Sequence, residues 1–247
     1  MSTQKFRILL FNVGYATALD GSLRNYLLRF YRYLYTPRRI IRQVRQAIFL
    51  LLKKVQPDVC CFVEIHRKTG SVPHPHVYTS HDMANKYGLH SVLRRLPFFR
   101  DNCNGFFAKG ACSFQKMYFK NGTKKLIYEI KLREDVSLLL VHFSLERRVR
   151  RLQVAELHDI IKARKNVILC GDFNIFKGRS ELEELAEECD LRIVNSPSDV
   201  TFPAVNPTKS LDLFLCPKHI KNAHATVLKG VHASDHLPVL LELEMAA

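Results

Sequence analysis

The sequence lacks an apolar run long enough to cross a membrane. A transmembrane helix needs about 20 consecutive apolar residues, and polar or charged residues interrupt every apolar stretch before that length. Lys5 and Arg7 precede an apolar segment that ends in Ala16-Thr17-Ala18, which superficially resembles a secretory signal, but Asn12 and Gly14 interrupt it and favour a core strand. We therefore expect no cleaved signal peptide, and a protein that is soluble or attached to a membrane surface.

The sequence also lacks a Cys-x-x-Cys pair and an even number of cysteines. Four of its seven cysteines fall inside or beside apolar runs: Cys60, Cys61, Cys170 and Cys216. This pattern predicts buried thiols in a reducing, cytoplasmic compartment, and it argues against a disulfide framework or a zinc site. Five histidines lie in residues 66–90 without a recognisable ligand spacing, and we interpret them as solvated residues of a loop or short helix: His66, His74, His76, His81 and His90.

Acidic residues are scarce in the first part of the chain. The net charge is +15, and residues 1–150 hold 27 Lys/Arg against 9 Asp/Glu, whereas residues 151–247 hold 11 against 14. A positive field of this kind attracts polyanions such as nucleic acid, an anionic membrane surface or phosphorylated small molecules. No repeat, low-complexity segment or linker interrupts the sequence, so residues 1–247 are predicted to form a single domain.

A basic, aromatic insertion is predicted at about residues 21–37. Tyrosines and Phe30 alternate there with Arg24, Arg29 and Arg32. This mixture suits base stacking with phosphate contact, and it equally suits a membrane interface. The remaining alternative is an ordinary amphipathic helix whose arginines extend along its surface. Thr36 as N-cap and Pro37 at the first position then predict a helix with one apolar stripe: Ile40, Val44, Ile48, Leu51 and Val55.

Apolar runs bounded by turn residues predict most of the strands. The expected strands are residues 6–11, 59–63, 106–119, 125–132, 136–141, 167–170, 211–216 and 237–241. Asn121-Gly122 predicts a hairpin turn between two of them. Further helices are expected at residues 147–163 and after Ser180, which could form a capping box with Glu183.

Polar side chains recur at or near the ends of these strands. They are Asn12, Glu64, His142, Asp172, Asn174, Asp212, Asp235 and His236. Asp172 and Asn174 are two residues apart, so in extended geometry both side chains leave the same face of the chain. A buried carboxylate such as Asp212 must be paired, bind a metal or face a cleft. Polar groups from several strand ends that meet at one mouth are a common way to build a functional site.

In this order the motifs resemble those of the endonuclease/exonuclease/phosphatase superfamily. The superfamily includes deoxyribonucleases, abasic-site endonucleases, sphingomyelinases, inositol polyphosphate 5-phosphatases, deadenylases and tyrosyl-DNA phosphodiesterases. The motifs are Phe11-Asn12-Val13-Gly14, Pro57-Asp58 through Val63-Glu64, Asn104-Gly105, Val141-His142-Phe143, Gly171-Asp172-Phe173-Asn174, Leu211-Asp212 and Ser234-Asp235-His236-Leu237-Pro238-Val239. The resemblance implies an α/β (α+β) fold, a four-layer αββα sandwich of two mixed β-sheets flanked by helices.

The resemblance also implies a metal-dependent phosphoesterase site. Glu64 would bind the divalent metal, supported by Asn12 and Asp235. Ligation by oxygen atoms alone suits Mg²⁺ or Mn²⁺ better than zinc. The metal would neutralise phosphate oxygens and the charge that develops on the leaving oxygen.

The remaining motif residues would act on water and phosphate. Asp172 would orient or deprotonate the attacking water, and Asn174 would donate to a phosphate oxygen. His236, held by Asp212, would contact the phosphate or share in proton transfer. His142 matches a histidine that acts on the leaving group in the deoxyribonuclease and sphingomyelinase branches, and Asn104 would be a hydrogen-bond donor to the phosphate.

Two departures from the family pattern bear on the substrate. Abasic-site and tyrosyl-DNA enzymes commonly have an acidic residue shortly after the first-strand asparagine, but Val13-Gly14-Tyr15 offers none, and the chain has no tryptophan. Both features weaken a DNA-repair assignment. The expected function is a nuclease acting on nucleic acid, and the alternative is a phosphoesterase acting on phospholipid or inositol-phosphate headgroups. A binding module with a vestigial site is the third hypothesis.

Overall fold

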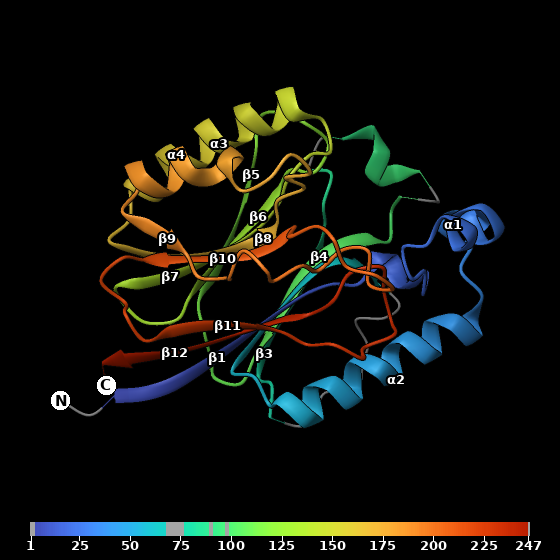
Figure 1. Cartoon of the computed structure of the whole chain (residues 1–247), viewed down its shortest axis with the longest axis horizontal. Helices are drawn as coiled ribbons and strands as arrows, with labels where there is room; N and C mark the ends of the chain where they lie inside the picture. Colours follow the sequence, from blue (N-terminus) through green and yellow to red (C-terminus); the bar gives the residue numbers. More distant parts are fainter. Residues whose placement is uncertain (1–2, 68–76, 89–90, 97–98, 247) are drawn as a thin grey trace.

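The computed structural model describes residues 3–67, 77–88, 91–96 and 99–246, and it contains two six-stranded mixed sheets with helices on their outer faces (Figure 1). The four-layer αββα sandwich predicted from the sequence is thereby confirmed. His74, His76 and His90, three of the histidines interpreted as solvated, lie outside the described residues.

The first sheet has the strand order β11-β12-β1-β2-β4-β3. Its centre is the parallel pair of β1 and β2, and the other neighbours are antiparallel. The strands are β1 (Thr3–Asn12), β2 (Val59–His66), β3 (Ser80–Asn85), β4 (Asn102–Ala108), β11 (Ala223–Val227) and β12 (Val239–Ala246).

The second sheet has the strand order β5-β6-β7-β8-β10-β9. It also contains one parallel pair, β7 with β8. The strands are β5 (Phe114–Tyr118), β6 (Leu126–Lys131), β7 (Val136–His142), β8 (Asn166–Asp172), β9 (Leu191–Ile193) and β10 (Asp212–Pro217).

Helices cover the outer face of each sheet. Helix α2 (Arg38–Val55) packs on the first sheet, and α3 (Arg147–Lys162) and α4 (Ser180–Glu188) lie over the second (Figure 1). Helix α1 (Leu23–Arg29) protrudes at one end of the molecule (Figure 1). The short 3-10 helices are η1 (Gly14–Ala16), η2 (Phe30–Tyr33) and η4 (Val92–Arg95). Among the described residues, every helix is too short or too polar to span a bilayer.

Both faces of the central strands are buried, which explains why they read as continuous apolar runs. In β1, Ile8 and Leu10 point into the core between the two sheets, whereas Leu9 and Phe11 pack toward α2. All seven cysteines are free thiols, and the four expected inside the protein are buried.

Several local predictions were wrong. Residues 66–90 were expected to be a loop or short helix, but Ser80–Asn85 forms the edge strand β3 and carries His81. The single strand expected at residues 106–119 is instead two strands, β4 and β5, in different sheets.

The helix caps also differ from the predicted ones. Pro37 is the N-cap of α2, and Thr36 donates to the carbonyl of Arg32. The buried stripe of α2 uses Ile41 in place of Ile40. Helix α4 begins at Ser180 without a side-chain cap, so the capping box is absent there.

Candidate active site

The site lies where the two parallel strand pairs end. Asn12 ends β1, His142 ends β7 and Asp172 ends β8, while Glu64 lies near the end of β2. His142 and Asp172 are register partners across β7 and β8. Because parallel strands place their carboxyl ends at the same edge of a sheet, these polar groups meet at one edge of the sandwich.

Asp172 is the most heavily hydrogen-bonded carboxylate of the site. Its Oδ2 atom accepts from Asn12 Nδ2 at 2.9 Å and Asn174 Nδ2 at 3.3 Å, and its Oδ1 atom accepts from the backbone N–H of Asn174 at 3.0 Å. Burial raises the pKa of Asp172 to about 6, although the nearby charge of His236 opposes the rise. The side chain is therefore held in one orientation with the basicity of a general base.

Two backbone features place Asp172 and Asn174. Gly171 packs so closely on β7 that an added Cβ would lie 2.0 Å from the carbonyl oxygen of Val141. Asn174 has a φ of 50°, a left-handed conformation that asparagine tolerates better than most residues. Its amide also donates to the carbonyl of Phe143 at 2.9 Å. Both amide hydrogens of Asn174 are thus directed to protein acceptors.

Asp212 and His236 form a buried carboxylate–imidazole pair. His236 Nδ1 lies 2.7 Å from Asp212 Oδ2, and Thr201 Oγ1 donates to the same oxygen at 2.6 Å. Burial alone lowers the pKa of His236, but the charge and hydrogen bond of Asp212 outweigh it and raise the pKa to about 10. The ring therefore carries a positive charge at neutral pH, with Nδ1 engaged by the carboxylate.

His142 lies between the two halves of the site. Its fully buried ring places Nε2 3.5 Å from Glu64 Oε1 and 3.7 Å from Asp172 Oδ2. Burial, with Lys124 and Lys86 nearby, lowers the pKa of His142 well below its usual value, so the imidazole is neutral. One histidine thus lies beside carboxylates from the two sheets.

Glu64 lies at an irregularity in β2. The β2–β4 register shifts between Phe62 and Ile65, and Glu64 has a φ of 51°. Bulges of this kind redirect a side chain toward a functional site. The backbone N–H of Glu64 donates to Asn104 Oδ1 at 3.1 Å, while the Asn104 Nδ2 atom is buried without a hydrogen-bond partner among the described residues.

A tyrosine hydroxyl and two lysine amino groups surround the Glu64 carboxylate. Tyr15 donates its hydroxyl to Oε1 at 2.8 Å, and the Nζ atoms of Lys124 and Lys86 lie 3.6 Å and 3.8 Å from the same oxygen. Lys124 also contacts His142 Nε2. Burial raises the pKa of Glu64, and Lys124 opposes this rise.

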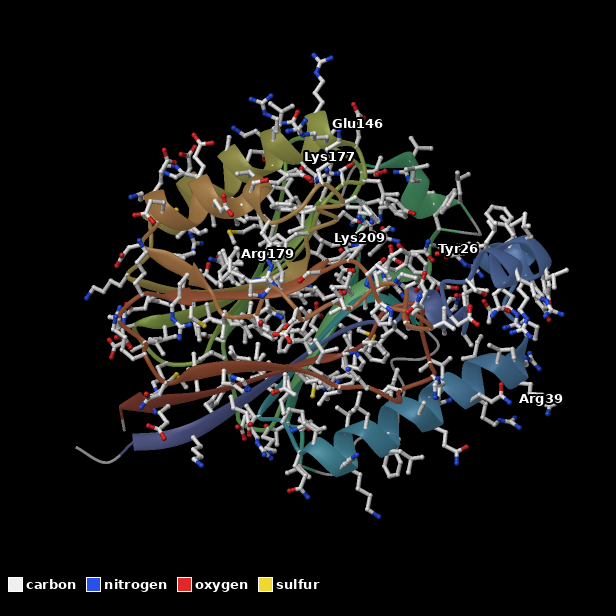
Figure 2. All side chains as sticks on the ribbon, in the orientation of Figure 1. Tyr26, Arg39, Glu146, Lys177, Arg179 and Lys209 are labelled. Carbon is white, nitrogen blue, oxygen red and sulfur yellow. The ribbon has the colours of Figure 1, made fainter. Side chains whose placement is uncertain are left out.

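Asp235 is connected to the predicted insertion. Its Oδ2 atom accepts a hydrogen bond of 2.6 Å from the hydroxyl of Tyr26 in α1, and its Oδ1 atom accepts from Ser234 Oγ at 3.2 Å. Figure 2 marks Tyr26 between α1 and the body of the protein. The insertion therefore reaches the site through Tyr26.

Four contributors to the site were missed by sequence reasoning: Tyr15, Tyr26, Lys86 and Lys124. Tyr15 follows the first motif directly, so its position was a usable signal. Lys86 follows the missed strand β3, and Lys124 lies in the hairpin loop between β5 and β6. Neither lysine has a sequence pattern that separates it from the lysines on the surface.

The donor set of the site fits a divalent cation. Four carboxylates meet here, from Glu64, Asp172, Asp212 and Asp235, together with amide oxygens, and hard divalent cations prefer such oxygen ligands. The ligand atoms of Asp172, Asp212 and His236 lie within 4.8 Å of one another and could hold a metal ion. The 2.7 Å contact between Asp212 and His236 shows that these two residues already bind each other.

The chain belongs to the endonuclease/exonuclease/phosphatase family, whose sequence model matches residues 38–236. The family predicted from the strand-end motifs is therefore confirmed, and the fold is that of a phosphoesterase. A search of curated protein sequences found no match.

Solved structures of similar fold cover nearly the whole chain. Sphingomyelinase C from Streptomyces griseocarneus has a TM-score of 0.70 at 13% identity, covering 98% of this chain and 100% of that chain. Humanized D. rerio TDP2 has a TM-score of 0.64 at 13% identity, covering 98% and 99%. The human Nocturnin catalytic domain has a TM-score of 0.66 at 18% identity, covering 98% and 96%. At these identities the likeness shows the fold alone.

Proposed function

We propose that this protein hydrolyses phosphodiester bonds with the help of a divalent metal ion. The observation that carries the proposal is the position of His142, whose Nε2 atom lies within 3.7 Å of both Glu64 and Asp172. A carboxylate for a cation and a carboxylate for the attacking water thereby lie next to the same imidazole nitrogen atom. This arrangement brings the groups needed for a single phosphate group to one place.

The protein groups have distinct tasks in the proposed reaction. Asp172 orients the attacking water and accepts its proton, since hydrogen bonds fix its orientation and burial raises its pKa to about 6. The positively charged His236 contacts a phosphate oxygen, and Asp212 fixes the ring through Nδ1. His142 and the adjacent Lys124 face the leaving oxygen, where the ammonium group can supply a proton or positive charge.

Asn174 and Asn104 differ in whether their amide hydrogens are free to bind a phosphate oxygen. Asn174 donates its amide hydrogens to Asp172 and to the carbonyl of Phe143, so its role is to position Asp172, the general base. Asn104 retains a buried, partnerless Nδ2 atom, which makes it the better donor to a phosphate oxygen. A buried unpaired donor costs free energy unless a ligand satisfies it.

Glu64, with Asn12 and Asp235, would hold the metal, and the oxygen ligands favour Mg²⁺ or Mn²⁺. When bound, the ion supplies charge neutralisation for the phosphate and the leaving oxygen. Lys124 beside Glu64 adds positive charge on the same side of the site, whereas burial lowers the pKa of Lys86 well below its usual value.

The substrate class has two candidates. Nucleic acid is the first candidate, supported by the positive charge of residues 1–150. A phospholipid headgroup is the second candidate, because the helix that reaches Asp235 exposes large apolar side chains. Solved proteins of similar fold include a sphingomyelinase and TDP2 with single-strand DNA product, so the fold accommodates both kinds of substrate.

Hydrolysis of a substrate panel tests the proposal. Plasmid DNA, RNA, sphingomyelin and phosphoinositides are each incubated with EDTA and then with excess Mg²⁺. We expect turnover of one class with Mg²⁺ and none with EDTA. His236→Gln should abolish this turnover, and His158→Gln, on the outer helix α3, is the matched control. Activity that persists in EDTA, or that survives the His236 substitution, contradicts the proposal, and no turnover of any substrate favours a binding module.

A further inference from the structure

The α1–η2 segment, residues 23–35, exposes an unusual amount of apolar surface. Seven of its large apolar side chains are between 51% and 76% exposed: Leu23, Leu27, Leu28, Phe30, Tyr31, Leu34 and Tyr35. Neither α1 nor η2 contains a buried residue. Contiguous apolar patches on a soluble protein typically mark a surface that another molecule covers.

Helix α1 does not bury an apolar face as an ordinary surface helix does. Asn25 and Tyr26 face the body of the protein, where Asn25 contacts Asp20 and Tyr26 donates to Asp235, whereas Arg24 and Arg29 are exposed. Its leucines face outward. A surface helix of a globular protein normally buries its apolar face. The outward leucines of α1 therefore do not stabilise the core, and they are available to a partner.

Basic residues surround this apolar surface without acidic residues between them. Arg24 and Arg29 are exposed in α1, and no Asp or Glu occurs in residues 21–57. Arg39 lies at the outer end of α2, close to the same end of the molecule (Figure 2). Arg32 has a structural role, because it donates to the carbonyl of Thr17 at 3.0 Å.

We propose that the α1–η2 segment docks the protein on an anionic lipid membrane. Leucines and aromatic rings insert among the acyl chains next to the headgroups, and arginines contact the anionic headgroups, as interfacial helices do. Single-stranded nucleic acid fits less well, because four of the seven exposed side chains are leucines, which offer no ring for base stacking. A second copy fits less well because it would bring the same arginines against one another.

The docking surface is joined to the candidate active site. The 2.6 Å hydrogen bond from Tyr26 to Asp235 fixes α1 beside the C-terminal motif. A membrane that receives α1 would therefore lie near the mouth of the site. Docking is a binding property, so it is independent of the proposed hydrolysis and can be measured without turnover.

Vesicle co-sedimentation in EDTA tests the proposal. The probes are vesicles of phosphatidylcholine alone and of phosphatidylcholine mixed with phosphatidylserine. We expect binding to the anionic vesicles, with affinity that falls roughly 100-fold in Leu27→Asp/Leu28→Asp, because each leucine transferred to the interface contributes about tenfold or more. Arg24→Gln/Arg29→Gln should weaken binding roughly 20-fold and reduce the preference for anionic lipid.

The matched control is Leu50→Asp/Leu152→Asp, which adds the same charge at exposed leucines of α2 and α3. Its affinity for vesicles should lie within about twofold of the wild-type affinity, once the effect of the two added negative charges on attraction to anionic lipid is subtracted. Absence of wild-type binding to anionic vesicles, equal losses in the control, or no loss in Leu27→Asp/Leu28→Asp would overturn the proposal. Two other results would also overturn it. One is a wild-type dimer in analytical ultracentrifugation that Leu27→Asp/Leu28→Asp dissociates. The other is a wild-type protein that does not bind vesicles but binds an oligonucleotide, with that binding abolished in Leu27→Asp/Leu28→Asp.

Discussion

Replacement of Asp172 by asparagine should make the protein more stable while it abolishes activity. Burial raises the pKa of this carboxyl from 3.8 to about 6, so the folded protein holds the proton more tightly than the unfolded chain does. Ionisation of Asp172 at neutral pH therefore costs the folded state about 3 kcal/mol. An uncharged side chain of the same shape avoids this cost.

The gain is partly offset by a lost hydrogen bond. Asp172 accepts on both oxygens, and an asparagine amide can accept on one only. With the amide oxygen in the place of Oδ2, the backbone N–H of Asn174 loses its acceptor. Such a loss costs about 1–2 kcal/mol. We therefore expect Asp172→Asn to raise the free energy of unfolding at pH 7.5 by about 1–2 kcal/mol.

Urea denaturation in EDTA at several pH values measures this effect. The cost of ionisation is fully present above about pH 6 and absent below about pH 3.8, so the advantage of the variant should shrink as the pH falls through this window. Asp159→Asn, at an exposed position of α3, should be neutral. A variant less stable than wild type at pH 7.5, or an advantage that does not depend on pH, would refute the reasoning. Phosphodiesterase activity should fall at least about 100-fold in Asp172→Asn.

Three further predictions concern other parts of the chain. Burial alone would raise the pKa of Glu129, but hydrogen bonds from Arg, Gln and Ser side chains lower it to about 2. The free energy of unfolding of Glu129→Gln at pH 7 should therefore be lower than that of wild type by about 3 kcal/mol. In urea denaturation, this deficit should disappear as the pH falls from about 4.5 to about 2. Gly171→Ala should destabilise the protein by about 3 kcal/mol or more in the same assay, because its Cβ meets a backbone carbonyl, whereas Gly110→Ala, with open space around it, should be close to neutral. Lys124→Met should lower the turnover number about 100-fold, and its neighbour Lys125→Met should not; equal losses in the two would argue against a role for Lys124 at the site.

The sequence predicts the strand ends of the site well because buried strands and their terminal polar groups are local patterns. The runs ending at Asn12, His142 and Asp172 have few polar interruptions, and both of their faces are buried in the fold. Strand β3 was missed because Ser80–Asn85 is an edge strand of polar and small residues without apolar alternation.

Contacts between distant parts of the chain could not be predicted from patterns. Tyr26 and Asp235 are 209 residues apart and meet only because α1 folds back over the C-terminal motif. Lys86 reaches Glu64 from the end of a strand that was not expected. The outward direction of the leucines in α1 is likewise set by tertiary contacts, since an isolated amphipathic helix has no defined inner face.

Side chains from residues 12 to 236 should together hold one cation and one phosphate group. The most direct measurement is anomalous diffraction from crystals soaked with Mn²⁺ and inorganic phosphate. We predict a manganese peak in contact with the Glu64 carboxylate and a phosphate between that ion and His236. A manganese peak elsewhere, or a fully soaked crystal with no peak at Glu64, would contradict the claim.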